Sequence, residues 1–295
     1  MAAEPAEADG QSEAARRARA AFADVPPQPG AAKPDPILTA VGVRRNFGGI
    51  AAVDVDRVEV QRGSITALIG PNGAGKTTFF NLVTGFDKPD AGEWSFDGEP
   101  MDGVAPHRMA ARGMVRTFQL TKSLTKLPVI ENMKLGATGQ RGERMWEGLI
   151  PARWRAQERE IEARADALLK RFRLDNMRDE YAGSLSGGQR KLLEMARALM
   201  TNPTLVMLDE PMAGVNPALK QSLNQHVRGL RDEGMTVLFV EHDMDMVHDI
   251  SDWVVVMAEG RVIAEGTPDD IASNPAVIDA YLGGHQGLSL MEDVE

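Results

Sequence analysis

Short, uninterrupted apolar runs recur along the chain, and each is separated from the next by longer amphipathic stretches. Runs of four or five apolar residues without polar alternation are typical of strands buried on both faces. The stretches between them have helical periodicity, so the pattern predicts a parallel sheet covered by helices, an α/β fold. The predicted buried strands are residues 65–69, 205–208, 236–240 and 253–257, and the first predicted helix follows at residues 76–82.

Other segments flank this predicted core. Residues 37–43, 53–60 and 93–96 also have the pattern of strands, and a turn is predicted at Asp97-Gly98. Residues from about 120 to 183 are charged and helical in pattern, as in the run over residues 155–169. This stretch is predicted to be a helical subdomain inserted into the α/β core.

The two ends of the chain differ from the region between them. Residues 1–36 are rich in alanine, proline and charge and hold almost no large apolar side chains. Such a segment buries too little surface to offset its ordering entropy, so a disordered tail is predicted, with a transient helix over residues 14–23. Residues 284–295 are predicted to form a polar C-terminal tail, which leaves residues 37–283 as the folded domain.

Bulk composition narrows the classes of function. The chain has 295 residues, 43% of them hydrophobic and 26% charged, with a net charge of -10. An acidic balance argues against broad nucleic-acid binding, and the absence of cysteine excludes disulfides and thiolate metal sites. No apolar run approaches the roughly 20 residues that span a bilayer, and the N-terminus lacks the pattern of a signal peptide. A role at a membrane would therefore require a partner.

A glycine-rich loop follows the first buried strand. Residues 70–78, Gly-Pro-Asn-Gly-Ala-Gly-Lys-Thr-Thr, match the phosphate-binding pattern G-x-x-x-x-G-K-[ST], between a predicted strand and a predicted helix. Glycines let backbone N–H groups converge on phosphate oxygens, and the helix N-terminus adds partial positive charge. Lys76 supplies a full charge for the β and γ phosphates, Thr77 a hydroxyl for Mg²⁺, and Thr78 a hydrogen bond to phosphate. A chance glycine-rich turn before a helix is the alternative.

A second buried strand ends in two acidic residues. Asp209 and Glu210 follow the apolar run over residues 205–208, at the edge where open α/β sheets bind ligands. Asp209 is placed to hold Mg²⁺, and Glu210 to polarise the attacking water. A surface turn that happens to carry acids is the alternative. Phosphoryl transfer needs such positioning and charge neutralisation more than covalent chemistry.

Further motifs resemble those of the ATPases of ATP-binding-cassette (ABC) transporters. Residues 184–190 contain Leu-Ser-Gly-Gly-Gln, which resembles the family signature, and Gln119 and His242 lie where the family has its Q-loop and switch histidine. Phe47 precedes the phosphate loop where the family has an adenine-stacking aromatic residue, although tyrosine is more common there. Alone, each residue has a plainer interpretation: a loop amide, a core histidine, a core phenylalanine, or a helix N-cap after a turn. Their order carries the resemblance over residues 37–283.

The resemblance implies a fold and a set of roles. The fold is an ABC cassette of the P-loop NTPase class, with a RecA-like parallel-sheet core, an antiparallel β subdomain and an inserted helical subdomain. The implied cofactors are ATP and Mg²⁺, and two cassettes would pack head to tail around two ATP molecules. The implied catalytic residues are Glu210, His242 and Gln119, and the implied metal ligands are Thr77, Gln119 and Asp209. The implied nucleotide-binding residues are Phe47, Asn72, Gly73, Gly75, Lys76, Thr77, Thr78, Ser186, Gly187, Gly188 and Gln189.

Finer features resemble the branched-chain amino acid importer ATPases. That subfamily carries runs similar to Glu-Pro-Met-Ala-Gly-Val-Asn-Pro at residues 210–217, including Asn216 in the D-loop. Similar runs occur at residues 84–86, 115–119, 241–244 and 274–283. The alternatives are the ATPase of a lipopolysaccharide exporter, which shares the Tyr-Leu-Gly close, and importers of urea or aromatic acids. A soluble ABC ATPase would usually carry two cassettes, and a catalytically dead cassette would lack several of these residues.

The importer resemblance also implies partners. These are membrane-spanning permease subunits, a second ABC ATPase subunit (the same chain or a different one) and, indirectly, a substrate-binding protein. The location implied is the cytoplasmic face of the cell membrane, with peripheral attachment and no nucleic acid. Residues 120–135 are predicted to line the permease groove, or alternatively to form the core of the helical subdomain. The apolar residues concerned are Leu120, Leu124, Leu127, Val129 and Ile130.

Overall fold

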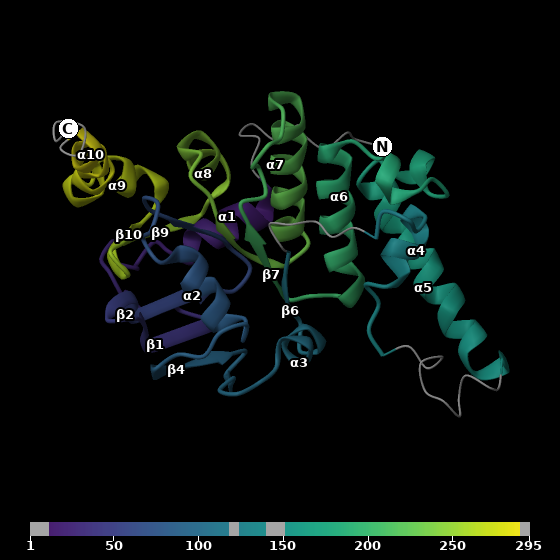
Figure 1. Ribbon diagram of the computed structural model, residues 1–295, viewed down its shortest axis with the longest axis horizontal. Coiled ribbons are helices and arrows are strands. Elements are labelled where there is room, and N and C mark those ends of the chain that lie inside the picture. The colour runs from purple at the N-terminus through teal and green to yellow at the C-terminus, as the bar shows by residue number, and fades with distance from the viewer. Residues whose placement is uncertain (1–11, 118–123, 140–150, 290–295) are drawn as a thin grey trace, which may run out of the picture. The chain divides into compact units, whose positions relative to one another are not determined.

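The fold was obtained as a computed structural model, which describes residues 12–117, 124–139 and 151–289 (Figure 1). The chain forms two units. The first holds the described residues up to Val83, Asp87–Gly103, and the chain from Val227 onward. The second holds Thr84–Phe86 and Val104–His226.

An antiparallel sheet forms one part of the first unit. Its strand order is β2-β1-β4-β5. Gly48 and Gly49 both have positive φ angles, 55° and 91°, which allows the tight hairpin that joins β1 to β2. Val43, Val53 and Val55 are buried, in keeping with the alternation that the sequence shows here. The strands are β1 (Pro36–Phe47), β2 (Ile50–Gln61), β4 (Ala91–Phe96) and β5 (Glu99–Pro100).

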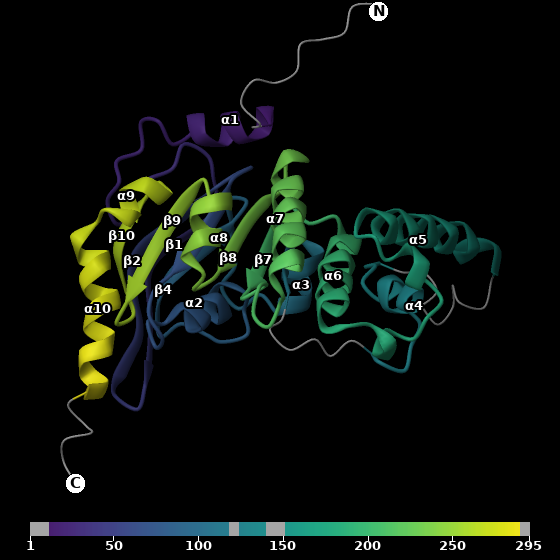
Figure 2. The same ribbon diagram turned by 90° about the horizontal axis from the view of Figure 1, so that it is seen from above.

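Parallel strands form the other part of the first unit. Strand β3 lies between β8 and β9 and is parallel to both, while β10 is antiparallel to β9. All five residues of β3 are buried, which explains why its sequence is a continuous apolar run. Helices α9 and α10 lie along the β10 edge (Figure 2). The elements are β3 (Ile65–Ile69), α2 (Lys76–Val83), β8 (Thr236–Val240), α8 (Met244–Ile250), β9 (Trp253–Ala258), β10 (Arg261–Gly266), α9 (Pro268–Ala272) and α10 (Pro275–Ser289).

The second unit is mainly helical around two parallel strands, β6 and β7. Helices α4, α5 and α6 pack pairwise against one another, and Met133, Ala165 and Leu193 are among the side chains they bury. Helix α7 begins in this unit and ends in the first. The elements are α3 (Pro106–Ala111), β6 (Met114–Arg116), α4 (Val129–Lys134), α5 (Pro151–Arg171), α6 (Gly187–Ala198), β7 (Leu205–Asp209) and α7 (Pro217–Asp232).

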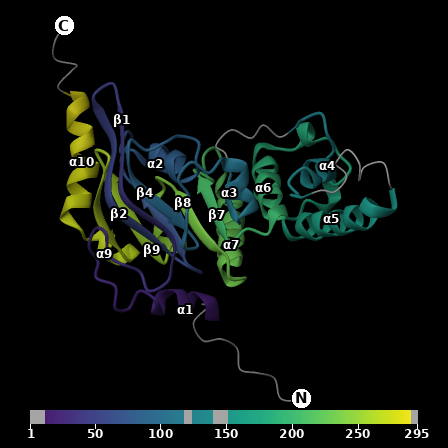
Figure 3. The same ribbon diagram turned by 90° about the horizontal axis from the view of Figure 1, so that it is seen from below.

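Residues 12–35 differ from the disordered tail that their composition predicts. Helix α1 (Glu13–Ala20) is capped by Ser12 and buries Ala15 and Ala18 within the first unit (Figure 3). Beyond it, the Phe22 ring stacks on Trp253 at a centroid distance of 4.8 Å. Small alanines, one aromatic ring and one buried ion pair, described below, order this segment with little apolar surface.

The remaining boundaries follow the prediction with local differences. The parallel strands, the separate antiparallel sheet and the predicted helix after residue 75 are all present. Helix α10 continues to Ser289, so the predicted C-terminal tail is helical over its first residues. Among the residues that the structure describes, none of the helices has both the length and the apolar character needed to cross a membrane.

Candidate functional site

The glycine-rich loop between β3 and α2 is a tight backbone cradle. A Cβ atom on Gly70 would lie 2.0 Å from the carbonyl oxygen of Met257, and one on Gly75 would lie 2.3 Å from that of Ala52. Both glycines also have positive φ angles, 148° and 94°. The loop can therefore curl this closely only with glycine at these two positions.

Lys76 begins helix α2 and bends back over this loop. Its Nζ donates to the carbonyl oxygens of Gly70 at 2.7 Å and Pro71 at 2.8 Å. The lysine charge therefore lies beside the N-terminus of α2, where backbone N–H groups favour an anion. Asn72, Gly73 and Thr77 are exposed, and Thr78 is half-buried. A cation, free N–H groups and an exposed hydroxyl on one loop fit a polyphosphate with its metal ion.

Phe47 ends strand β1 at the hairpin with β2. Its ring is 49% exposed, and the guanidinium of Arg45 lies 4.7 Å from the ring centre. The start of β2 contacts the phosphate loop, because Ala52 is the residue that a side chain on Gly75 would meet. An exposed aromatic ring on this hairpin is available for stacking, as the predicted role requires.

His242 follows strand β8, which is the parallel neighbour of β3. Leu68 pairs with Val240 in this register, so the phosphate loop and His242 follow the carboxyl ends of adjacent strands. The His242 side chain is exposed, and its Nδ1 lies 3.7 Å from Oε2 of the buried Glu241. The next residue, Asp243, caps helix α8 by accepting from the backbone N–H of Met246.

Asp209 ends strand β7 in the second unit. Its Oδ2 lies 2.6 Å from Nη2 of Arg116, and the exposed fractions of the Asp209 and Arg116 side chains are 4% and 7%. The carboxylate thus has a buried cationic partner that the sequence patterns do not indicate. Arg116 belongs to the run over residues 115–119, but its pairing with a residue so far along the chain has no sequence signature.

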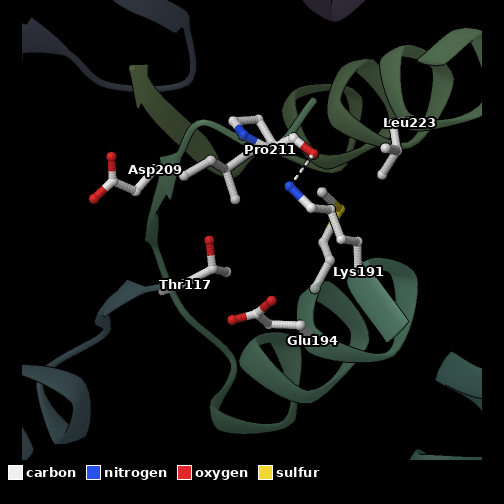
Figure 4. A pocket seen from close by; sticks show the side chains of 8 residues that line it. Thr117, Lys191, Glu194, Asp209, Pro211 and Leu223 are labelled. Atoms are coloured by element: carbon white, nitrogen blue, oxygen red, sulfur yellow. Dashed lines mark hydrogen bonds between the residues drawn. The ribbon is translucent and has the colours of Figure 1, made fainter. Parts of the chain in front are cut away.

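Glu210 has an unusual backbone conformation. Its φ angle is +45°, in the left-handed region that residues other than glycine rarely adopt. Lys191 holds the turn, because its Nζ donates to the carbonyl oxygens of Glu210 at 3.1 Å and Pro211 at 3.2 Å. Figure 4 shows Lys191 reaching Pro211 across a small cavity that Asp209 and Thr117 also line. Backbone strain of this kind clusters at functional sites.

The signature motif forms the start of helix α6. Ser186 is the N-cap, and Gly187 is the first helical residue, three residues earlier than the sequence pattern predicts. The Ser186 hydroxyl accepts from the backbone N–H of Gln189, whose side chain accepts in return from the Ser186 N–H. Ser186 and Gly187 are exposed, and Gly188 is half-buried. A helix N-terminus with exposed glycines can face an anion.

Two other predictions concern neighbouring segments. Gln119 lies outside the described residues, as does Leu120. Of the residues predicted to line a permease groove, Val129 and Ile130 are buried in α4, whereas Leu124 is exposed. The two buried residues therefore belong to the core of the helical part, which was the alternative interpretation.

The residues present fit a magnesium ion that phosphate oxygens help to hold. Magnesium usually keeps one or two protein oxygen ligands together with phosphate and water oxygens. Thr77 and Asp209 are oxygen donors of this type. Within residues 12–117, 124–139 and 151–289, no three histidine, aspartate or glutamate side chains gather as a complete metal site. A site that also draws on a bound nucleotide is consistent with this donor set.

Two family models match the chain. Residues 53–213 match the model of the ABC transporter family, and residues 261–286 match that of the branched-chain amino acid ATP-binding cassette transporter. The second match covers strand β10, α9 and most of α10.

Curated proteins and solved structures agree with these matches. A probable branched-chain amino acid transport ATP-binding protein of Archaeoglobus fulgidus is 43% identical over 247 residues, covering 84% of this chain and 95% of the relative. The high-affinity protein of the same description from Pseudomonas aeruginosa is 41% identical, covering 84% and 98%.

Among solved structures, a nucleotide-free ATP-binding cassette from an ABC transporter is 37% identical, with a TM-score of 0.73 and coverage of 83% and 98%. An ATP-binding cassette in its ADP conformation is 36% identical, with the same TM-score and coverage of 84% and 99%. The chain therefore belongs to the ABC transporter family, as an ATP-hydrolysing cassette of the branched-chain amino acid type.

Proposed function

We propose that this chain powers the uptake of branched-chain amino acids, or related small polar solutes, across the cytoplasmic membrane. The observation that carries the proposal is the match of residues 261–286 to the branched-chain amino acid cassette, on a chain with a phosphate loop and a signature motif. The names of the relatives support the same cargo class. Neither the phosphate loop nor the signature distinguishes an importer from an exporter, so the direction of transport rests on the subfamily.

The proposed mechanism assigns one task to each part of the site. The backbone of the phosphate loop and Lys76 bind the β and γ phosphates, and Phe47 stacks on the adenine. Thr77, Asp209 and Gln119 hold Mg²⁺, which neutralises charge that develops on the phosphates. Glu210 orients and polarises the attacking water, and His242 contacts the γ-phosphate.

The signature motif acts on the nucleotide of a second cassette. The N-terminus of α6, with Ser186, Gly187 and Gly188, contacts the γ-phosphate that the opposite subunit binds, while Gln189 holds Ser186 in place. ATP thereby closes the pair of cassettes, and hydrolysis lets them open. The exposure of Ser186 and Gly187 supports this role, because a contact across subunits needs an accessible helix N-terminus.

The proposed assembly places the cassette at the cytoplasmic face of the membrane. Permease subunits span the membrane, a second ABC ATPase completes the pair, and a substrate-binding protein delivers the solute. Leu124 is a candidate contact to the permease, because this large apolar side chain is exposed near the N-terminus of α4.

A pull-down of the tagged chain from detergent-solubilised native membranes, followed by mass spectrometry, tests the assembly. We expect two multi-spanning permeases and an ABC ATPase partner, together with ATPase activity. Permeases of a lipopolysaccharide exporter would overturn the importer, and permeases of a urea or aromatic-acid system would change the cargo. Recovery of no membrane protein from membranes that retain the complex would contradict the transport role.

A further inference from the structure

Arg116 and Asp209 are brought together by the register of two parallel strands. Arg116 pairs with Met207, and side chains two residues apart on a strand share a face, so Asp209 lies just beyond Met207 on the same face. The backbone N–H of Thr117 donates to the carbonyl oxygen of Met207 and holds this register. The 2.6 Å contact between Arg116 and Asp209 therefore follows from the sheet itself.

The opposite side of the Arg116 guanidinium is enclosed by the segment Thr84–Phe86. Nη1 of Arg116 lies 3.3 Å from the Thr84 hydroxyl, and the Phe86 ring centre lies 5.9 Å from the guanidinium carbon. Gly85 makes this enclosure possible, because a side chain there would lie 2.8 Å from the carbonyl oxygen of Val104.

A cavity of about 220 Å³ adjoins this segment. Its lining, taken from the described part of the chain, contains no carboxylate. The lining residues are Thr84, Phe86, Pro106, His107, Met109, Ala110, Met114, Val115 and Arg116. The acidic group that the structure gives to Arg116 is thus Asp209, and the surroundings hold the guanidinium against it.

We propose that Arg116 is a positioning residue that occupies the Asp209 carboxylate while no divalent cation is bound and competes with the cation for it. This inference rests on the proposed role of Asp209 as a magnesium ligand. A carboxylate oxygen that accepts from a guanidinium cannot also take a cation at full strength, and two positive charges close to one carboxylate repel each other. Arrival of the cation is therefore an exchange, and Arg116 sets its affinity.

The exchange has two measurable consequences of opposite sign. Removing the charge of Arg116 leaves Asp209 buried without its cation, so the cation-free protein loses stability. The same change removes the competitor, so divalent cations bind more tightly. A residue with a purely structural role would destabilise the site and either weaken cation binding or leave it unchanged.

The test compares the parent protein with Arg116→Gln, with Arg116→Lys, and with the matched control Arg108→Gln, an exposed arginine on helix α3. Mn²⁺ binding is measured by electron paramagnetic resonance with the protein saturated in ADP, because Mn²⁺ accepts the same oxygen ligands as Mg²⁺. Thermal unfolding is followed in EDTA and again with Mn²⁺ and ADP.

For Arg116→Gln we expect about tenfold tighter Mn²⁺ binding, the size of a typical coupling between two ligands. We also expect a melting temperature lowered by about 10 °C in EDTA. Most of that loss should return with Mn²⁺ and ADP, because ligands stabilise the state they bind. Arg116→Lys, which keeps the charge, should stay near the parent, and so should Arg108→Gln.

Each failure points to a different error. If the parent protein binds no Mn²⁺ in the presence of ADP, the proposed nucleotide and metal site is wrong. If the parent binds Mn²⁺ but Arg116→Gln binds it equally or more weakly, the competition is wrong while the site stands. Should Arg116→Gln fail to fold, Arg116→Met takes its place, because its apolar chain suits the Phe86 side of the enclosure.

Discussion

Lys33 and Glu265 form an ion pair in which neither side chain is exposed to solvent. The Nζ atom of Lys33 lies 2.8 Å from Oε2 of Glu265, and both exposed fractions are 0%. The same carboxylate accepts from the indole N–H of Trp253 at 3.2 Å and from the backbone N–H of Gly30 at 3.1 Å. The backbone N–H of Lys33 donates to Glu59 at 2.6 Å. The N-terminal segment is thereby tied to strands β2, β9 and β10.

Replacing Lys33 with methionine should destabilise the first unit. The change keeps the length of the chain but leaves Glu265 buried without its cation, which costs about 3 kcal/mol of unfolding free energy. Chemical denaturation of the parent and the variant measures this difference.

The ion pair between Arg17 and Glu13 on α1 provides the matched control, because both its side chains are 80% exposed. Exposed pairs contribute little, so Arg17→Met should leave the unfolding free energy nearly unchanged. An equal loss in the two variants would show that the buried position of Lys33 is not what matters.

This segment marks the limit of what the sequence predicts. The buried parallel strands were predictable because burial on both faces leaves a continuous apolar run, and the phosphate loop because its contacts lie within nine residues, 70–78. Residues 12–35 show neither pattern. Their order depends on Lys33 meeting Glu265, 232 positions along the chain, and a composition-based argument cannot include such a contact.

The candidate site divides in the same way. Asp209, Glu210 and Ser186 were predicted from local motifs, and the structure places them at a strand end and a helix N-cap. Arg116 and Lys191 were missed, because each acts on residues that only the fold brings near. Arg116 is 93 positions from its partner, and Lys191 reaches carbonyl oxygens, which no residue type identifies.

Replacing Glu210 with glutamine should slow ATP hydrolysis by about 10²- to 10⁴-fold, the usual contribution of a general base. ATP binding should stay near the parent value, because glutamine keeps the size of the side chain and places no new charge at the phosphates. Phosphate release and the binding of a fluorescent ATP analogue measure the two effects.

Lys76→Ala provides the contrasting variant, since loss of the phosphate-loop charge should abolish most nucleotide affinity. A Glu210→Gln protein that hydrolyses ATP at the parent rate would remove Glu210 from the role of water-polarising residue. Unchanged ATP binding by Lys76→Ala would contradict the phosphate-loop assignment.

Lys191→Met should lower the rate of hydrolysis with little change in ATP affinity. The lysine holds the turn that places Glu210 in its left-handed conformation, and a small displacement of a reacting group costs about 10²-fold. Steady-state kinetics separate the expected fall in kcat from an unchanged KM.

Lys191→Arg, which can still donate to the two carbonyl oxygens, should recover part of the rate. Lys170→Met, at an exposed position on α5, controls for the loss of a lysine in the same unit. If Lys191→Arg is as slow as Lys191→Met, the hydrogen bonds to the turn are not the reason for the effect.

His226 should make the stability of the second unit depend on pH. Its ring stacks on Phe172 at a centroid distance of 4.5 Å. Burial lowers the pKa of His226 below its ordinary value of 6.5, and the positive charges of Arg171 and Arg173 lower the pKa further. The unfolded chain therefore takes up this proton more readily than the folded protein does.

The sign of the pH dependence follows from this lowered pKa. Above the unfolded-state pKa, near 6.5, the ring is neutral in both states, and stability is at its full value. As the pH falls from there through the lowered pKa of the folded protein, the unfolded state gains protons first and stability is lost. His226→Phe keeps the stacking on Phe172 but cannot titrate, so it should lose less unfolding free energy between about pH 8 and about pH 5.5. His107→Gln, at an exposed position on α3, should show the parent's dependence. A His226→Phe protein that loses as much stability on acidification as the parent would place the pH sensitivity in another group.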